Sequence, residues 1–263
     1  MLDTVLASDG ASLAVLKIIA VGSWIVLILV AERALPAVTR RGGWARVGRN
    51  AGLWAINIVL SRFAVLPLTV LAAGVGLGWR PEALNGGWAI VADIILLDLW
   101  IYAWHQVNHR IPLLWRFHEI HHLDEFLDAT SAVRFHAGEV LISAFVRAPV
   151  IIVLDMPLAS VLAFETLVLM AAVFQHSNLR LPIRLERALA LVIITPSIHW
   201  VHHHAVRQDT DSNYGTILSL WDRLFGTLSP TPRTPELTIG VERLHDNAFW
   251  TLMLRPFRPR TDR

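Results

Sequence analysis

The chain has 263 residues, of which 54% are apolar and only 17% are charged, and its formal net charge is +2. A typical soluble domain has about 25% charged residues, so this composition favours a membrane protein. The absence of cysteine excludes disulfides, iron–sulfur clusters and thiolate-bound haem, and without a basic helix or an aromatic RNA-binding motif we expect no nucleic-acid partner.

Five apolar stretches are candidates for membrane-spanning helices, each of which needs about 20 residues. They cover residues 11–31, 51–77, 88–104, 139–154 and 157–174. The chain starts without the basic segment of a cleaved signal peptide, so we expect the first stretch to be retained as a membrane anchor. We predict an all-α membrane protein with about four to five transmembrane helices and a histidine-rich helical cap.

The fourth and fifth stretches are short, and Asp155-Met156-Pro157 joins them. This pattern predicts a helical hairpin that enters the membrane and returns to the same side. The alternative is a pair of helices buried in a soluble core, which the overall hydropathy disfavours.

The distribution of arginine predicts the orientation. The loop after the first stretch carries Arg33, Arg40, Arg41, Arg46 and Arg49, whereas the loop between the second and third carries only Arg80. The positive-inside rule then puts the first loop and all the histidine clusters at the cytoplasmic face. Because the composition is typical of a GC-rich bacterial genome, we expect this membrane to be a bacterial inner membrane.

Two later segments are also apolar. Residues 181–198 begin with a basic, partly amphipathic stretch, and we expect them to lie on the membrane interface rather than to span it. Residues 248–257 either dock on the membrane surface or pack on the cytoplasmic cap.

Eleven of the twelve histidines lie between His105 and His204. Three clusters hold most of them: H-Q-V-N-H at 105–109, H-E-I-H-H at 118–122 and H-W-V-H-H-H at 199–204, with His136 and His176 standing alone between the last two. Imidazole is the commonest protein ligand for transition metals, and one ion rarely takes more than about six ligands. So many histidines therefore indicate more than one metal ion.

Helical spacing lets each cluster act as a unit, because positions i, i+3 and i+4 share one face of a helix. Each cluster can therefore offer two or three imidazoles to a common centre: His105 and His109, then His118, His121 and His122, then His199, His202 and His203. His136 and His176 are further candidates, because the predicted topology puts them at the metal-side ends of two spans. His204 points off the shared face, and His245 is expected to be unrelated. Imidazole suits Fe, Zn, Cu or Ni, and the clusters alone do not choose among them.

Two simpler explanations fit less well. Structural zinc sites are closed, four-coordinate and usually include cysteine, whereas metal-buffering tracts are low-complexity runs. Polar groups should also orient the imidazoles from behind, and we expect Asp98, Tyr102, Asn178 and Asp222 to do so. Glu119, Asp124, Asp128, Glu139 and Asp211 are further candidates for that role.

At these residues the chain resembles the fatty acid hydroxylase and sterol desaturase superfamily of integral membrane oxygenases. The superfamily pattern H-x-x-x-H, H-x-x-H-H and H-x-x-H-H matches residues 105–109, 118–122 and 199–203 in order. Supporting matches are R-F-H at 134–136, H-S-N at 176–178, N-Y-G at 213–215 and W-D-R-L-F-G-T at 221–227.

The resemblance implies a di-iron centre held mostly by histidine, with the clustered histidines, His176 and His136 as ligands and no catalytic side chain beyond them. It also implies O2 as co-substrate and hydroxylation or desaturation of a lipid such as a sterol or a fatty acyl chain. The parts implied are N-terminal membrane helices in 1–87, a catalytic part in 88–228 and a C-terminal cytoplasmic tail in 229–263.

Reducing equivalents should come from a separate electron-donor protein, because the chain has no G-x-G-x-x-G fingerprint and no cysteine. Two other classes remain open: a membrane metal transporter or sensor, and a metal-free scaffold. Transport would distribute ligands along a path through the bilayer, whereas here they are expected to gather at one face.

Overall fold

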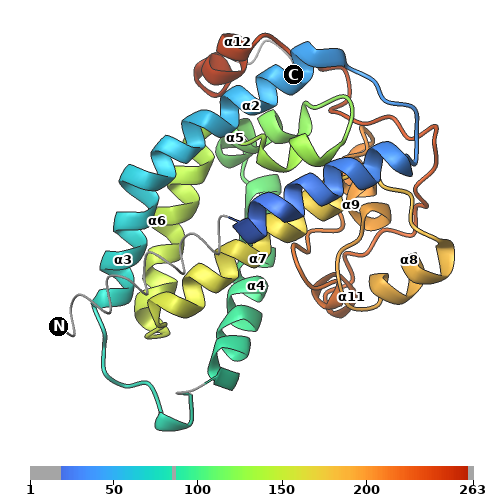
Figure 1. Cartoon of the computed structure of the whole chain (residues 1–263). Coiled ribbons are helices and arrows are strands. Elements are labelled where there is room, and N and C mark those ends of the chain that lie inside the picture. Colours follow the sequence, from blue (N-terminus) through green and yellow to red (C-terminus); the bar gives the residue numbers. More distant parts are fainter. Residues whose placement is uncertain (1–18, 85–86, 260–263) are drawn as a thin grey trace.

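The computed structural model describes residues 19–84 and 87–259, and within them every regular element is a helix (Figure 1). Residues 19–34 are helical. The elements that follow are α2 (Gly43–Leu60), η1 (Ser61–Val65), α3 (Leu66–Gly74), η2 (Glu82–Leu84), α4 (Gly87–Arg110), α5 (Pro112–His122), η3 (Ala129–Val133), α6 (Ala137–Val153) and α7 (Leu158–His176). The remaining ones are α8 (Ile183–Ala190), α9 (Pro196–His202), α10 (Arg207–Thr210), α11 (Leu220–Leu224), α12 (Phe249–Leu254) and η4 (Arg255–Phe257).

The second predicted span is one long helix made of α2, η1 and α3. It runs over Gly43–Gly74 rather than 51–77, because Gly42 adopts a left-handed conformation with φ 86° directly before it. Pro67 lacks an N–H for the preceding turn, and the π-helical turn η1 accommodates this within an unbroken helix.

Three helices are long and apolar enough to cross a membrane within the described residues: Gly43–Gly74, α4 and α7. The third predicted span is longer than expected, since α4 continues to Arg110 and so carries His105 and His109. The fourth, α6, has only 17 residues and contains Pro149. The first predicted stretch lies partly outside the described residues.

The hairpin predicted around Asp155 is present, since α6 ends at Val153 and α7 begins at Leu158. Asp155 has φ 49° and accepts hydrogen bonds from the backbone N–H groups of Leu77 and Gly78. The turn is therefore tied to the segment that directly follows the long helix Gly43–Gly74.

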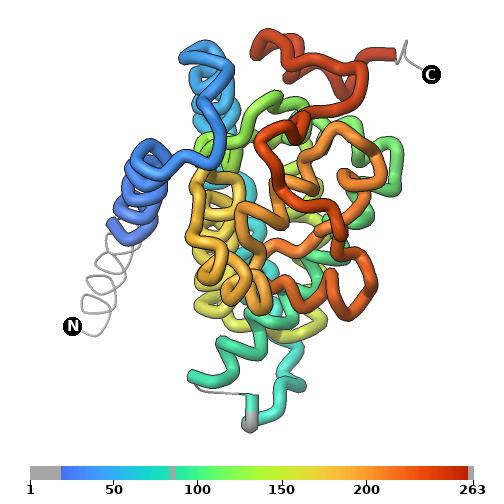
Figure 2. The backbone as a smooth tube through the Cα atoms, turned by 90° about the vertical axis from the view of Figure 1, so that its right-hand side faces the viewer, coloured from blue at the N-terminus to red at the C-terminus, as the bar shows by residue number. Residues whose placement is uncertain are grey.

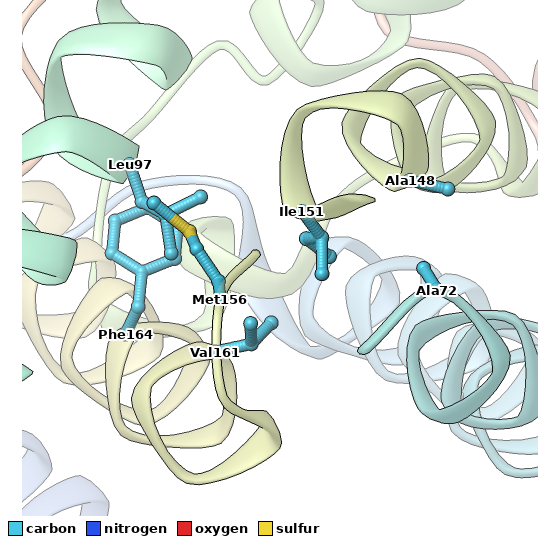
Figure 3. Packing of buried hydrophobic residues seen from close by; sticks show 7 residues of the cluster. All are labelled: Ala72, Leu97, Ala148, Ile151, Met156, Val161 and Phe164. Carbon is cyan, nitrogen blue, oxygen red and sulfur yellow. The ribbon is translucent and has the colours of Figure 1, made fainter. Parts of the chain in front are cut away.

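Four helices meet in the apolar core that supports the cap. Figure 3 shows the buried residues Ala72 of α3, Leu97 of α4, Ile151 of α6 and Phe164 of α7, together with Met156 of the turn between α6 and α7. Burying side chains of this size contributes about 2 kcal/mol each, so this packing stabilises α4, α6 and α7 against one another.

The C-terminal segment returns along the cap and ends beside α2, as Figure 2 shows. There α12 approaches α2 closely, because a Cβ atom on Gly52 would lie 3.0 Å from the Phe249 ring. Leu252 of α12 is fully buried with Leu53 of α2 and Ile120 of α5. This end of the 248–257 segment thus packs on the cap, which was one of the two alternatives predicted.

Candidate metal centre

Nine histidines form two buried groups at one end of the helical bundle. The first group holds His105, His109, His118, His122 and His202, and the second holds His121, His176, His199 and His203. Within each group the available ligand atoms lie within 4.8 Å of one another. The structure thus brings together all eight clustered histidines that the sequence singles out, and His176 with them.

Neighbouring residues are divided between the groups. His121 and His122 on α5 go to different groups, and so do His202 and His203 at the end of α9. Consecutive residues on a helix project about 100° apart, so a helix lying between two centres supplies both. The H-x-x-H-H spacing therefore serves two sites rather than one.

Six histidines direct their outer ring nitrogen, Nδ1, at an acceptor. These contacts are His105 to Tyr214 O at 2.9 Å, His109 to Asp211 Oδ1 at 3.3 Å, His118 to Glu139 Oε1 at 2.7 Å, His121 to Arg134 O at 3.1 Å, His176 to Ala172 O at 2.7 Å and His202 to Ser212 O at 2.7 Å. Carbonyl and carboxylate oxygens only accept, so Nδ1 carries the hydrogen in each ring. In the neutral imidazole Nε2 then presents a lone pair to the interior of its group.

These lone pairs face each other at short range. Nε2 of His105 is 3.1 Å from Nε2 of His118, and Nε2 of His121 is 3.0 Å from Nε2 of His176. Two neutral rings with hydrogen on Nδ1 repel in this arrangement, and a shared cation removes the repulsion. Two nitrogens each about 2.1 Å from one ion and about 90° apart would lie about 3.0 Å from each other.

Other ring nitrogens in the groups are buried without a hydrogen-bond partner. They are Nε2 of His109 and His202, Nδ1 of His122 and His199, and both nitrogens of His203. Leaving a buried polar atom unpaired costs about 1–3 kcal/mol, so several unpaired ring nitrogens at one place fit a site that binds metal ions.

Five imidazoles outside the spanning helices are held neutral. Burial lowers the pKa of His202 to about 3 and lowers the pKa of His121, His122, His199 and His203 well below 6.5, with neighbouring histidines adding to the effect in those four. Neutral imidazole is the form that coordinates a metal ion, so the donor set fits a pair of transition-metal ions.

His136 does not join either group, contrary to the prediction. Its Nδ1 accepts the backbone N–H of Gly138 at 2.9 Å, which caps the start of α6, and its Nε2 lies 3.0 Å from the carbonyl oxygen of Met253. Both nitrogens are thereby occupied in local structure. His204, which was expected to be spare, pairs with Asp209 at 2.7 Å outside the groups.

The four polar residues expected behind the imidazoles hydrogen-bond to other backbone and side-chain atoms instead. Asp98 accepts from Ile217 N, Leu218 N and Trp221 Nε1, Tyr102 contacts Thr227 and Gln106, Asn178 bonds Val38, and Asp222 accepts from Tyr214 N, Gly215 N and Thr227. Asp222 reaches the site only indirectly, because Tyr214 in turn accepts from His105.

The groups that do orient the imidazoles are Glu139, Asp211 and four backbone carbonyls. Both carboxylates were among the further candidates in the sequence, but nothing in the sequence distinguished them from solvated charges. Every residue has a backbone carbonyl, so the sequence could not indicate which four carbonyls accept hydrogen bonds from the imidazoles.

Comparison with known proteins agrees with this geometry. The model of the fatty acid hydroxylase family matches residues 90–227, which include all nine histidines of the two groups. No solved structure matches the chain.

Three relatives illustrate the similarity. An ornithine lipid hydroxylase of Rhizobium tropici is 27% identical over 67% of this chain and 53% of its own length. An alkylglycerol monooxygenase of Danio rerio is 28% identical over 56% of this chain and 32% of its own, and a cholesterol 25-hydroxylase-like protein of the same fish is 30% identical over 56% and 58%. The matched part thus spans about a third to three fifths of these relatives.

Proposed function

The chain belongs to the fatty acid hydroxylase family, and we propose that it is a membrane-bound oxygenase that uses O2 to hydroxylate a C–H bond of a lipid. The observation that carries the proposal is the pair of facing lone-pair contacts, one in each histidine group. Desaturation that begins at the same C–H bond is the alternative reaction. The position of the substrate beside the site would decide between the two.

The proposed ligands are the nine histidines of the two groups, with an iron ion in each. When bound, two irons supply the oxidising power toward O2 and an unactivated C–H bond that no amino acid side chain has. His136 is left out of this ligand set because its ring nitrogens are used in local structure.

The chain's own residues would orient the ligands and exclude water. Glu139 and Asp211 hold His118 and His109 in one tautomer and fix the orientation of their rings. Phe135 stacks on His121 with 4.3 Å between ring centroids, and Trp115 lies 4.8 Å from His109. An apolar shell of this kind keeps water from a reactive centre.

Two features support a lipid substrate drawn from the membrane. The names of the relatives each include a lipid. In addition, the last turns of the spanning helices α4 and α7 supply histidines to the two groups: His105 and His109 to the first and His176 to the second. Electrons would come from a separate donor protein. The arginine-rich loop after the first helical segment supports a cytoplasmic site, at the inner membrane of a bacterium.

A transporter fits less well, because ligand atoms within 4.8 Å of one another form a closed cluster and not a path across the bilayer. A metal-free scaffold would have no reason to keep buried lone pairs facing each other.

Metal content per chain tests the proposal, measured on detergent-purified protein from iron-supplemented cells. We expect about two metal ions in the parent. In the His121→Ala, His202→Ala double variant we expect loss of the ion of the second group, which keeps three ligands, and weaker retention of the ion of the first group, which keeps four. O2 consumption should then require both a lipid extract and a reductant. A parent chain that holds no metal would refute the di-iron proposal, whereas two ions without lipid-dependent O2 consumption would refute the activity alone.

A further inference from the structure

Six apolar side chains on two segments distant in the sequence are strongly exposed. They are Leu185, Leu191 and Val192 from α8 and the turn after it, and Leu220, Leu224 and Phe225 from α11, with exposed fractions between 46% and 66%. We call this set the α8–α11 face. Figure 1 shows the two helices side by side at the edge of the cap.

Hydrogen bonds join the two segments into one unit. Ser219 donates its hydroxyl and Arg223 its guanidinium to the carbonyl oxygen of Ala190, both at 2.8 Å. The N–H of Ile194 also donates to the carbonyl of Ile217 at 2.9 Å. The exposed leucines of α8 and α11 therefore belong to one continuous surface.

This unit is attached to α4 well inside its length. Asp98 accepts hydrogen bonds from Ile217 N at 3.1 Å and Leu218 N at 3.0 Å, and Phe225 stacks on Tyr102 with centroids 5.4 Å apart. Asp98 lies about 16 Å along α4 from Gly87 and about 18 Å from Arg110, at a rise of about 1.5 Å per residue.

That attachment fixes the depth of the face. If α4 crosses a hydrocarbon core about 30 Å thick, Asp98 lies at the level of that core, and so does the loop it holds. Backbone N–H groups at this depth need a protein partner, which the Asp98 carboxylate provides for Ile217 and Leu218. Side chains of the same loop that point away from α4 then meet acyl chains.

The exposed charged side chains around the α8–α11 face are all positive. Arg184, Arg187 and Arg223 are exposed, whereas Glu186 is buried and accepts from the backbone N–H of Ser197. Asp222 is also buried and bonded to the backbone of Tyr214 and Gly215. Long arginine side chains beside an apolar face reach up to lipid headgroups and favour anionic ones.

We propose that the α8–α11 face is embedded in the leaflet at the His105 end of α4, and that its arginines select anionic lipid there. The face would thus be a second lipid-contacting surface beside the spanning helices, built by the cap itself. This inference is independent of the reaction that the chain performs.

Single-cysteine labelling tests the proposal, because the chain contains no cysteine of its own. Leu191→Cys and Leu224→Cys would each be labelled with an environment-sensitive fluorophore in the full-length protein. The protein is then placed in nanodiscs of phosphatidylcholine and phosphatidylglycerol, with brominated acyl chains on one lipid at a time. Val206→Cys is the matched control, since Val206 is 49% exposed and lies beyond the His109 end of α4, where its neighbour Arg207 donates to the carbonyl of His109.

We expect brominated lipid to quench the labels at 191 and 224 at least threefold more than the label at 206. At equal mole fraction, brominated phosphatidylglycerol should quench about twice as much as brominated phosphatidylcholine. The Arg184→Gln, Arg187→Gln variant, which leaves the Arg223 hydrogen bond to Ala190 in place, should lose most of that difference and keep the quenching by lipid.

Labels at 191 and 224 that iodide in water quenches as readily as the label at 206 would overturn the embedding. Labels shielded from both lipid and iodide would overturn it too, since they would mean that protein covers the face. Equal quenching by the two lipids in the parent would overturn the anionic preference.

Discussion

Asp246 in the C-terminal segment forms an ion pair with Arg134, with 2.6 Å between Oδ1 and Nη2. The Arg134 side chain is fully buried, and its backbone carbonyl accepts the hydrogen bond from Nδ1 of His121. Arg134 also donates to the carbonyl of Ile120, the residue before His121. A residue outside the stretch matched by the family model thus holds the loop that orients one of the proposed ligands.

Replacing Asp246 should therefore destabilise the cap and loosen the second histidine group. In Asp246→Asn the buried guanidinium of Arg134 loses its charge partner, which costs roughly 3 kcal/mol when a buried pair is broken on one side. We expect a lower unfolding temperature in detergent and a lower metal content. The control is Glu242→Gln, because the exposed pair of Glu242 with Arg243 should contribute under about 1 kcal/mol. Equal effects of the two variants would contradict the role given to Asp246.

Glu139 should control how tightly the first group holds its ion, because it bonds His118 Nδ1 at 2.7 Å. Removing a carboxylate behind a ligand histidine typically costs about 10- to 100-fold in metal affinity. We expect about tenfold weaker retention against a chelator for Glu139→Gln, which keeps an acceptor oxygen, and more for Glu139→Ala. Glu165→Gln is the control, since Glu165 pairs with Arg147 away from the histidines. If that control lost as much metal, the effect would be one of general stability.

His202 and His203 are neighbours that should affect different ions. His203→Ala leaves three ligands in the second group, whereas His202→Ala leaves four in the first. We therefore expect His203→Ala to lose about one ion per chain on dialysis, and His202→Ala to retain more of its metal. His204→Ala should keep the parent content, because His204 pairs with Asp209 outside both groups. Loss of both ions from every variant would mean that the histidines form one site.

The sequence predicted the helical class, the hairpin at Asp155 and the histidines to be grouped, because each depends on local spacing or on apolar runs. It did not predict which imidazole belongs to which group, since His121 and His122 diverge only through the angle between neighbours on α5. Asp98 was misassigned for a related reason. Its carboxylate accepts hydrogen bonds from the loop at 217–221, which is distant in sequence, and not from an imidazole.

The exclusion of His136 from the ligand set can be tested directly. Its ring accepts the N–H of Gly138, so His136→Ala should cost about 1 kcal/mol, as the loss of a helix cap does. His136→Asn can still cap α6 and should recover most of that stability. Because neither ring nitrogen of His136 faces a histidine group, both variants should keep the parent metal content. A chain that loses an ion in both variants would restore His136 to the ligand set.

Acid should destabilise the metal-free protein through its buried imidazoles. Burial lowers the pKa of His202 to about 3 from the usual 6.5 and lowers the pKa of His203 well below 6.5, so the unfolded chain binds more protons than the folded one below pH 6.5. Stability that is present above that pH is therefore lost as the pH falls toward 3, by about 1.4 kcal/mol per pH unit for each such histidine. We expect the unfolding temperature of the chelator-treated protein to fall steadily between pH 7 and pH 5. The His202→Gln, His203→Gln variant lacks two of the imidazoles that take up a proton when the chain unfolds. Its unfolding temperature should therefore depend less steeply on pH. An equal slope in the parent and the variant would mean that protonation of these two rings is not what destabilises the fold.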